Sequence, residues 1–214
     1  MSGDTLGITG RRTTIIEQLL RLVPDDRVVS IGRRLEDDVQ LDLAKAFDVR
    51  QFPGDLDRYV LAAGVMYPKP LADQSFDETA TSLAVNLTSV VRVCEHLLEV
   101  NPRARICLIG SESWRGSFDT TYFVAKAGLN AYVERRRLSH PEQQLVVVSP
   151  TIIMDSGMTG RRDDLDQVAQ RAHASPKQRF LSAAEVARLV HFVLWRDDGM
   201  LTNTVVSMNG GVFA

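Results

Sequence analysis

The sequence predicts an α/β domain in which one parallel sheet of about seven strands lies between two layers of helices. Short runs rich in Val, Ile and Leu alternate with longer segments whose apolar residues recur at the helical period. Runs that are apolar throughout are typical of parallel strands, because helices cover such strands on both faces. These two observations indicate a doubly wound, three-layer fold of the Rossmann type, whose ligands bind beyond the carboxyl ends of the strands.

The expected elements follow one another along the whole chain. Strands are predicted at 5–9, 27–31, 39–41, 58–62, 105–109, 145–149 and 204–208, and helices around 12–22, 76–100, 120–138 and 183–196. The helix at 76–100 has the clearest pattern, with an apolar stripe along its length. No linker, low-complexity stretch or repeat separates the elements, so we expect residues 1–214 to form a single domain.

The composition argues against several classes of function. The formal net charge of the 214 residues is −2, which disfavours nucleic-acid and membrane-surface partners. No apolar run approaches the roughly 20 residues of a membrane-spanning helix, and the first residues lack an apolar leader. Cys94 and Cys107 lie in a predicted helix and a predicted strand, as small core residues do, so a reducing cytoplasm is the expected compartment. The four histidines show no metal-ligand spacing, and we expect no metal.

A tyrosine and a lysine four residues apart are the most informative pair in the chain. Tyr122 and Lys126 share one face of a predicted helix, and Ser111 directly follows the predicted strand at 105–109. A cation beside a phenol favours the phenolate and lowers the tyrosine pKa from about 10. Tyr122 would then be an acid/base usable near neutral pH. The spacing alone is common on solvated helices, and Ser113 competes with Ser111 for the serine's role.

Two further residues follow the serine. Glu112 and Trp114 would face a substrate if this loop lines the site. The simpler interpretation is a surface acid and a packing aromatic.

Glycines and arginines follow the first predicted strand. Gly7 and Gly10 allow a tight strand–helix turn and the close approach of a pyrophosphate to a helix N-terminus. Arg11 and Arg12 add affinity for an anion. An ordinary glycine turn is the alternative interpretation.

The ends of the next strands carry residues suited to a nucleotide. Arg33 and Arg34 follow the second strand, where an acidic residue would bind the ribose of NAD and arginine suits the 2′-phosphate of NADP. A solvated basic turn is the alternative. Small residues at a strand end let a ring or a ribose lie against the backbone, or serve only in packing. The residues after the third and fourth strands are Asp42, Leu43, Ala62, Ala63 and Gly64.

In their order and spacing these residues resemble the short-chain dehydrogenase/reductase family along nearly the whole chain. Residues 54–64 look like the strand that leads into the family's Asn-Asn-Ala-Gly motif, and residues 201–211 resemble its last strand and Gly-Gly pair. Residues 149–153 stand where the family has Pro-Gly and a residue that touches nicotinamide. The catalytic motif of the family is matched by Asn86, Ser111, Tyr122 and Lys126.

The resemblance implies hydride transfer with a nicotinamide cofactor. Tyr122 would exchange a proton with the substrate oxygen, and Ser111 would hydrogen-bond that oxygen. Lys126 would lower the tyrosine pKa and hold the nicotinamide ribose, and Asn86 would support a water chain to Lys126. A polar segment around 155–180 would cover the substrate. The residues expected at the cofactor are Gly7, Thr9, Gly10, Arg11, Arg12, Arg33, Arg34, Asp42, Leu43, Ala62, Ala63, Gly64, Tyr122, Lys126, Pro150 and Ile153.

The sequence also departs from the family pattern. Thr14 and Ile16 replace the second and third glycines of the phosphate-binding loop, where a Cβ crowds a pyrophosphate. Residues 61–64 read Leu-Ala-Ala-Gly, without the two asparagines, and Thr151 replaces a glycine. The segment at 42–54 is too short for a full helix.

We therefore expect an oxidoreductase that prefers NADP(H) to NAD(H) and interconverts a carbonyl and an alcohol on a small molecule. The alternatives are a non-catalytic or regulatory cofactor-binding protein of the same fold and an epimerase-like enzyme that oxidises its substrate transiently. By resemblance to the family, self-association as a homodimer or homotetramer is expected. The sequence leaves the substrate open, because fold does not settle function.

Overall fold

A parallel sheet forms the centre of the structure, a computed structural model that describes residues 4–117, 119–162 and 164–212. Within these residues seven strands pair in the order β3-β2-β1-β4-β5-β6-β7, so the predicted doubly wound fold is confirmed. The strand order reverses between β1 and β4, where such folds bind ligands. The strands are β1 (Thr5–Thr9), β2 (Arg27–Gly32), β3 (Val39–Gln40), β4 (Arg58–Leu61), β5 (Arg105–Ile109), β6 (Gln144–Pro150) and β7 (Thr204–Met208).

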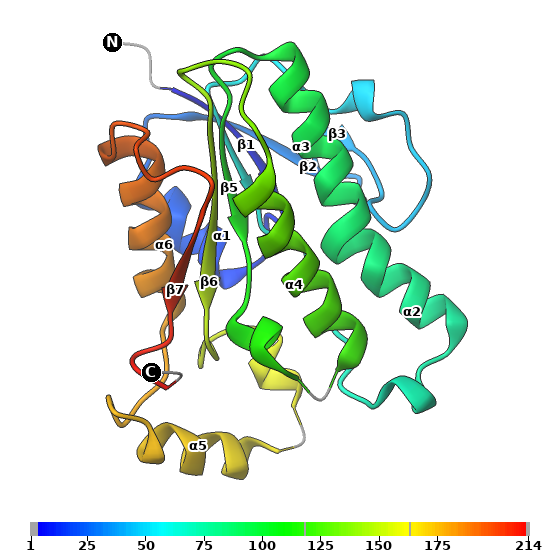
Figure 1. Ribbon diagram of the computed structural model, residues 1–214, viewed down its shortest axis with the longest axis vertical. Coiled ribbons are helices and arrows are strands. Elements are labelled where there is room, and N and C mark those ends of the chain that lie inside the picture. Colours follow the sequence, from blue (N-terminus) through cyan, green and yellow to red (C-terminus); the bar gives the residue numbers. More distant parts are fainter. Residues whose placement is uncertain (1–3, 118, 163, 213–214) are drawn as a thin grey trace.

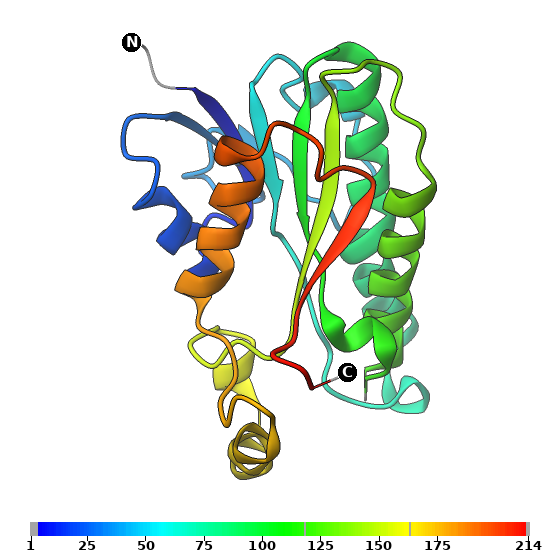
Figure 2. The ribbon, with the colours of Figure 1, turned by 60° about the vertical axis from the view of Figure 1, so that its left-hand side comes forward.

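Helices cover both faces of the sheet (Figures 1 and 2). On one face α1 (Thr14–Leu20) packs beside α6 (Ala183–His191). On the other face lie α2 (Phe76–Leu83), α3 (Ser89–Val100) and α4 (Thr120–Arg135). A further helix, α5 (Leu165–Ala174), lies outside the sandwich, below the sheet in Figure 1.

Local sequence signals determine where the helices begin. Ser75 and Glu78 form a capping box at the start of α2, and α6 begins in the same way. The Thr13 hydroxyl caps α1. The helix predicted at 76–100 is continuous, but it passes from α2 to α3 through a π-helical turn, Ala84–Thr88.

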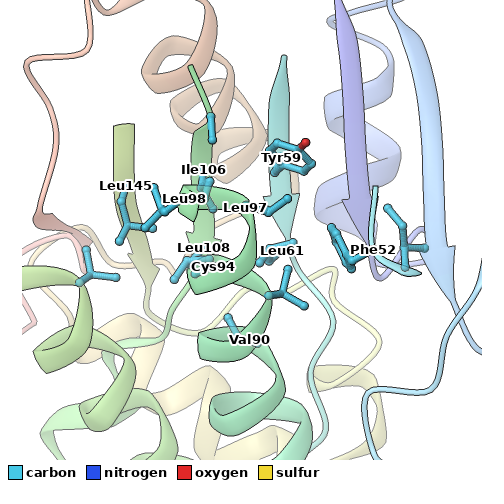
Figure 3. Close-up of a cluster of buried hydrophobic side chains, with 14 of the residues drawn as sticks. Phe52, Tyr59, Leu61, Val90, Cys94, Leu97, Leu98, Ile106, Leu108 and Leu145 are labelled. Carbon is cyan, nitrogen blue, oxygen red and sulfur yellow. The ribbon is translucent and has the colours of Figure 1, made fainter. Parts of the chain in front are cut away.

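Apolar side chains fill the space between the sheet and each helix layer. One cluster lies between the sheet and the helices α3 and α4, and Figure 3 shows part of it. A second cluster joins α1 and α6 to the opposite face. Cys94 and Cys107 are free and fully buried in the two different clusters, as predicted for small core residues. The buried residues labelled in Figure 3 are Phe52, Tyr59, Leu61, Val90, Cys94, Leu97, Leu98, Ile106, Leu108 and Leu145.

One helix was not predicted. The polar segment around 155–180 contains α5, whose buried face consists of Val168 and Ala172. Two buried positions are too few for a recognisable apolar stripe.

The connections beside β2 and β3 are short. Residues 33–38 join the two strands without a helix, and the Asp38 carboxylate folds back to accept hydrogen bonds from the Ser30 N–H and hydroxyl at 2.8 and 2.7 Å. Between β3 and β4 a single 3₁₀ turn, Val49–Gln51, stands where the sequence leaves no room for a full helix. Phe52 follows that turn and is buried against the sheet.

In the described ranges no helix has the length and apolar character needed to cross a membrane. Within the same ranges no three or more His, Cys, Asp or Glu side chains gather as metal ligands.

Candidate active site

The carboxyl end of β5 carries the predicted catalytic serine. Ser111 directly follows the strand and caps a 3₁₀ turn, Glu112–Arg115, that leads toward α4. Its hydroxyl lies 3.0 Å from the Ser113 hydroxyl and accepts the Ser113 N–H at 3.2 Å. The Ser111 side chain also lies close enough to Tyr122 to lower the pKa of its phenol, although burial outweighs this effect. The structure therefore brings Ser111 and Tyr122 together.

The first two turns of α4 place the tyrosine and the lysine. Tyr122 is 7% exposed and Lys126 4% exposed. The Lys126 ammonium donates a hydrogen bond to the Ile109 carbonyl at 2.8 Å and lies 5.5 Å from the centre of the Tyr122 ring. The pair shares one face of the helix, as the four-residue spacing requires.

The expected effect of Lys126 on the tyrosine is wrong in this structure. Burial raises the pKa of Tyr122 to about 12, because it disfavours the phenolate, and Ser111 offsets only part of the rise. The Lys126 ammonium is directed to the Ile109 carbonyl instead of the phenol oxygen. Burial also lowers the pKa of Lys126 to about 8. At neutral pH Tyr122 is therefore a neutral phenol with a proton to donate.

Asn86 is fully buried in the π-helical turn between α2 and α3. Its amide donates to the Val65 carbonyl at 2.7 Å and to the Ser82 carbonyl at 2.9 Å, and its oxygen accepts the Val65 N–H at 3.2 Å. The side chain thus fixes the loop that follows β4. The Asn86 side chain forms its hydrogen bonds with Val65 and Ser82. The predicted water chain to Lys126 would therefore have to start from another atom of this turn.

A buried aspartate missed by the sequence analysis positions the start of α4. Asp119 is 1% exposed and caps the helix by accepting the Tyr122 N–H at 3.0 Å. It also accepts the Tyr67 N–H at 2.7 Å, the Gln74 amide at 3.0 Å and the Thr121 hydroxyl at 2.8 Å. Its place three residues before Tyr122 is a helix-start signal that could have identified it.

Glu112 corrects a second expectation. The sequence favours a surface acid at this position, but the residue is 1% exposed. It accepts hydrogen bonds from Ser207 and Asn209 at the end of the sheet's last strand. No local signal reveals this burial, because those partners come from the other end of the chain.

The β1–α1 turn lies against the end of β4. Gly10 has φ +73°, and a Cβ there would lie 2.8 Å from the Ala63 nitrogen. The Thr9 hydroxyl accepts the Ala63 N–H at 3.1 Å. Gly7, by contrast, lies inside β1, where a Cβ would meet the Tyr59 ring at 2.9 Å. The structure thus gives Gly7 a packing position and Gly10 a position at the strand end.

The four predicted arginines lie exposed beside the ends of β1 and β2. Arg12 and Arg34 both form ion pairs with Glu36, a residue of the 33–38 turn. Arg33 takes part in no ion pair within the described part of the chain. Arg11 lies close enough to Asp38 to lower the pKa of that carboxyl, a smaller cause than its hydrogen bonds from Ser30.

Five further residues predicted to line the cofactor follow β3 or β4. Leu43 is buried in the core, while the Asp42 carboxylate caps its own turn by accepting the Ala44 N–H. Ala62, Ala63 and Gly64 follow β4 at the strand-order reversal.

The segment after β6 reaches over this end of the sheet. Pro150 ends β6, and Ile153, 8% exposed, forms a bridge with Leu181. Met158 reaches within 3.5 Å of the position that a Cβ on Gly64 would take. This part of the predicted covering segment therefore lies over the end of β4.

These residues fit a nicotinamide dinucleotide. Lys126 is a buried ammonium with three donors, of which the described residues use one, so it suits the hydroxyls of a ribose. The glycine at position 10 lets the β1–α1 turn pack against the backbone of Ala62 and Ala63 at the strand-order reversal, where such folds bind a diphosphate. Arg11 and Arg33 are available to anionic groups nearby.

Comparison with known proteins agrees with this geometry. The family model described as Enoyl-(Acyl carrier protein) reductase matches residues 14–213. The chain is 29% identical over 167 residues to a 3-oxoacyl-[acyl-carrier-protein] reductase, FabG, of Haemophilus influenzae, covering 75% of this chain and 68% of that protein. It is 28% identical over 172 residues to the reductase MabA of Mycobacterium avium, covering 77% and 67% of the two chains.

The fold is shared with a solved structure as well. A short-chain dehydrogenase/reductase from Brucella melitensis, named a glucose/ribitol dehydrogenase, superposes with a TM-score of 0.84 at 21% identity, and the match covers 100% of both chains. With its sheet order, its site geometry and a family match over nearly its whole length, the chain belongs to the short-chain dehydrogenase/reductase family.

Proposed function

We propose that this oxidoreductase uses NADPH to reduce a carbonyl group to an alcohol, with Tyr122 as the proton donor. The observation that carries the proposal is the buried arrangement of Ser111, Tyr122 and Lys126 at the end of β5. A phenol with its pKa raised to about 12 is protonated at neutral pH and can donate to an oxygen that gains negative charge.

Each residue has a separate task in this reaction. Tyr122 gives its proton to the substrate oxygen, and Ser111 hydrogen-bonds the same oxygen. Lys126 holds the ribose and, when protonated, stabilises the phenolate that remains after transfer. The bound nicotinamide supplies the hydride. Asn86 keeps the loop after β4 in place beside these groups.

The preference for NADPH rests on the end of β2. Arg33 and Arg34 stand there, where a dehydrogenase specific for NAD would carry an acidic residue. Arg33 is exposed and outside the ion pairs of the described chain, so it is available to a 2′-phosphate.

The substrate class that we propose to test first is a 3-oxoacyl thioester. Both curated relatives with similar sequences are named 3-oxoacyl-[acyl-carrier-protein] reductases. Acetoacetyl-CoA is a small probe with the same reacting carbonyl. An aldose should be tested beside it, because the protein of similar fold from Brucella melitensis is named a glucose/ribitol dehydrogenase.

Replacing Tyr122 by phenylalanine tests the proposal. We expect kcat for NADPH-dependent reduction of acetoacetyl-CoA to fall by about 10²–10⁴, with the Kd for NADPH nearly unchanged, because only the transferable proton is removed. Tyr132→Phe is the matched control, since Tyr132 lies on the same helix but donates to Glu95 at 2.6 Å. Full turnover by the Tyr122 variant would refute the assignment.

A second candidate function is cofactor binding without catalysis. It is favoured by Thr14 and Ile16, which stand where the family has glycines; both lie in the first turn of α1, where Ile16 is fully buried. Fluorescence titration with NADPH and NADH separates the two candidates. Tight NADPH binding with turnover supports the reductase, whereas binding without turnover of any carbonyl probe supports the second function.

A further inference from the structure

A buried carboxylate adjoins the catalytic serine. Glu112 directly follows Ser111, and only 1% of it is exposed, although Arg115 and Gly116 of the same loop are exposed. Glutamate is almost never so deeply buried unless it is paired, because removing its charge from water is costly. The environment of Glu112 must therefore supply donors.

Four side chains donate to this carboxylate, two to each oxygen. Oε1 accepts from Ser207 at 2.9 Å and from the Trp114 indole at 3.3 Å. Oε2 accepts from Asn209 at 3.0 Å and from Arg115 at 3.1 Å. Each oxygen thus has one donor from the serine loop and one from the end of the chain.

The donors keep the carboxylate ionised. Burial alone would raise the pKa of Glu112, but the hydrogen bonds from Asn209, Ser207 and Arg115 outweigh it and hold the pKa below its ordinary value. Glu112 is therefore a charged acceptor, which forms stronger hydrogen bonds than a neutral one.

The two remote donors belong to a part of the structure that adjoins the predicted nicotinamide site. Ser207 is in β7, Asn209 follows that strand, and β7 pairs in parallel with β6. The Thr151 N–H donates to the Met208 carbonyl at 2.9 Å, which ties the segment of Pro150 and Ile153 to the same strand. Glu112 thus links the serine loop to the strand pair that would flank the nicotinamide.

We propose that Glu112 is a positioning residue that anchors the Ser111 loop to the end of β7 and so fixes Ser111 relative to Tyr122 and the nicotinamide. This inference rests on the proposed reductase function. It assigns Glu112 no contact with the substrate, because its oxygens are occupied by the four donors.

A double-mutant cycle distinguishes positioning from a general structural role. Glu112→Gln keeps the size but presents an amide N–H₂ to two of the donors. We expect it to lower kcat with acetoacetyl-CoA about tenfold, to leave the Kd for NADPH unchanged and to raise the deuterium isotope effect with 4-deuterated NADPH. In a Ser111→Ala background the same change should have almost no further effect. Equal losses in both backgrounds would overturn the proposal.

Hydrogen exchange tests the anchor without any substrate. Backbone amides of residues 111–117 should exchange faster in Glu112→Gln than in the wild type. Glu95→Gln is the matched control, because Glu95 accepts from Tyr132 and Arg136, neither of which belongs to the serine loop. Asn209→Ala, which removes one donor and keeps the carboxylate, replaces Glu112→Gln if that variant does not fold. Unchanged exchange in the folded variants would overturn the anchor.

The two experiments also separate this inference from the proposed function. If the wild type reduces no carbonyl probe, the proposed function fails, and the exchange measurement alone decides whether Glu112 anchors the loop. If the wild type is active and the cycle is additive, the function stands and the positioning role fails.

Discussion

The candidate site has two halves that are held by different interactions. We call the part beside β1 and β2 the cofactor half, and the part beside β5 and α4, with the proposed catalytic residues, the catalytic half. Beside β1 and β2, Arg12 and Arg34 pair with Glu36 at the surface, where the side chains of Arg12 and Glu36 are 60% and 50% exposed. Beside β5 and α4, Glu112 and Asp119 are each 1% exposed and each accept four hydrogen bonds, two of them from distant segments of the chain. Exposed ion pairs contribute about 0–1 kcal/mol, whereas breaking a buried charged cluster costs about 3–5 kcal/mol.

The backbone shows the same contrast. The β2–β3 connection is a helix-free turn over residues 33–38, but the serine and tyrosine lie on segments tied to β7 and to the loop after β4. The difference teaches that buried hydrogen bonds hold the segments of the catalytic half in place. The cofactor half has weaker constraints, so its side chains can be changed with little effect on the fold.

The largest effect is expected in the catalytic half, at Asp119. Asp119→Ala leaves the N–H groups of Tyr67 and Tyr122 and the Gln74 amide without their acceptor. We expect unfolding free energy to fall by about 3–4 kcal/mol in urea titrations, together with turnover, because the turn that holds Tyr122 loosens. Asp77→Ala, at an exposed position in the first turn of α2, should cost less than about 0.5 kcal/mol. Equal losses of stability in Asp119→Ala and Asp77→Ala would argue against the special role of the buried carboxylate.

A stabilising change is expected at Lys126. The pKa of this lysine is lowered to about 8, from 10.5, by burial. Below pH 8 the folded state holds the charged lysine at a cost of up to about 3 kcal/mol, so Lys126→Met should unfold at higher urea concentration at pH 7 while losing activity.

The pH dependence gives this prediction a definite sign. Between pH 8 and 10.5 the unfolded chain binds more protons at this site than the folded one, so wild-type stability rises with pH. The advantage of Lys126→Met should therefore shrink between pH 7 and pH 10. The control Lys45→Met, at an exposed position, should show no such trend. A difference in unfolding free energy between the variant and the wild type that stays constant with pH would mean that burial does not lower the pKa of Lys126.

Gly10 is the point where the cofactor half should be least tolerant. Alanine there would combine a positive φ with a Cβ 2.8 Å from the Ala63 nitrogen. We expect a loss of about 1–2 kcal/mol in stability and a weaker NADPH affinity, measured by urea and fluorescence titration. Gly160→Ala has no atom within 4 Å of its Cβ and no positive φ, so it should be nearly neutral. An unchanged Gly10→Ala protein would show that this half tolerates even backbone strain.

The smallest effect is expected at Glu36. Glu36→Gln removes the anion that pairs with Arg12 and Arg34, which leaves both guanidinium groups free for a 2′-phosphate. We expect the Kd for NADPH to fall about two- to fivefold and the Kd for NADH to stay the same, with no change in stability. Glu17→Gln on α1 makes the same change in net charge as a control. Equal gains with both nucleotides would argue against a 2′-phosphate at this place.

Much of the framework could be predicted from local patterns. The apolar runs identified the strands, because a strand buried on both faces needs apolar side chains on both. The four-residue spacing placed Tyr122 and Lys126 on one helix face, because that relation depends only on helix geometry. α5 was missed, because only Val168 and Ala172 form its buried face.

The sequence by itself thus determined the fold, the strand ends and the residues that gather there, since these follow from periodicity and from the rules of parallel sheets. Only the tertiary structure decided which groups of the site are charged and which buried side chains hold its loops in place. The pKa of Tyr122 rises instead of falling because burial outweighs the hydrogen bond from Ser111, and the Lys126 ammonium is directed to the Ile109 carbonyl. Glu112 becomes an interior anchor because Ser207 and Asn209, 95 and 97 residues away, meet it across the sheet. Desolvation and long-range hydrogen bonds depend on which segments meet in space, and no local pattern records that.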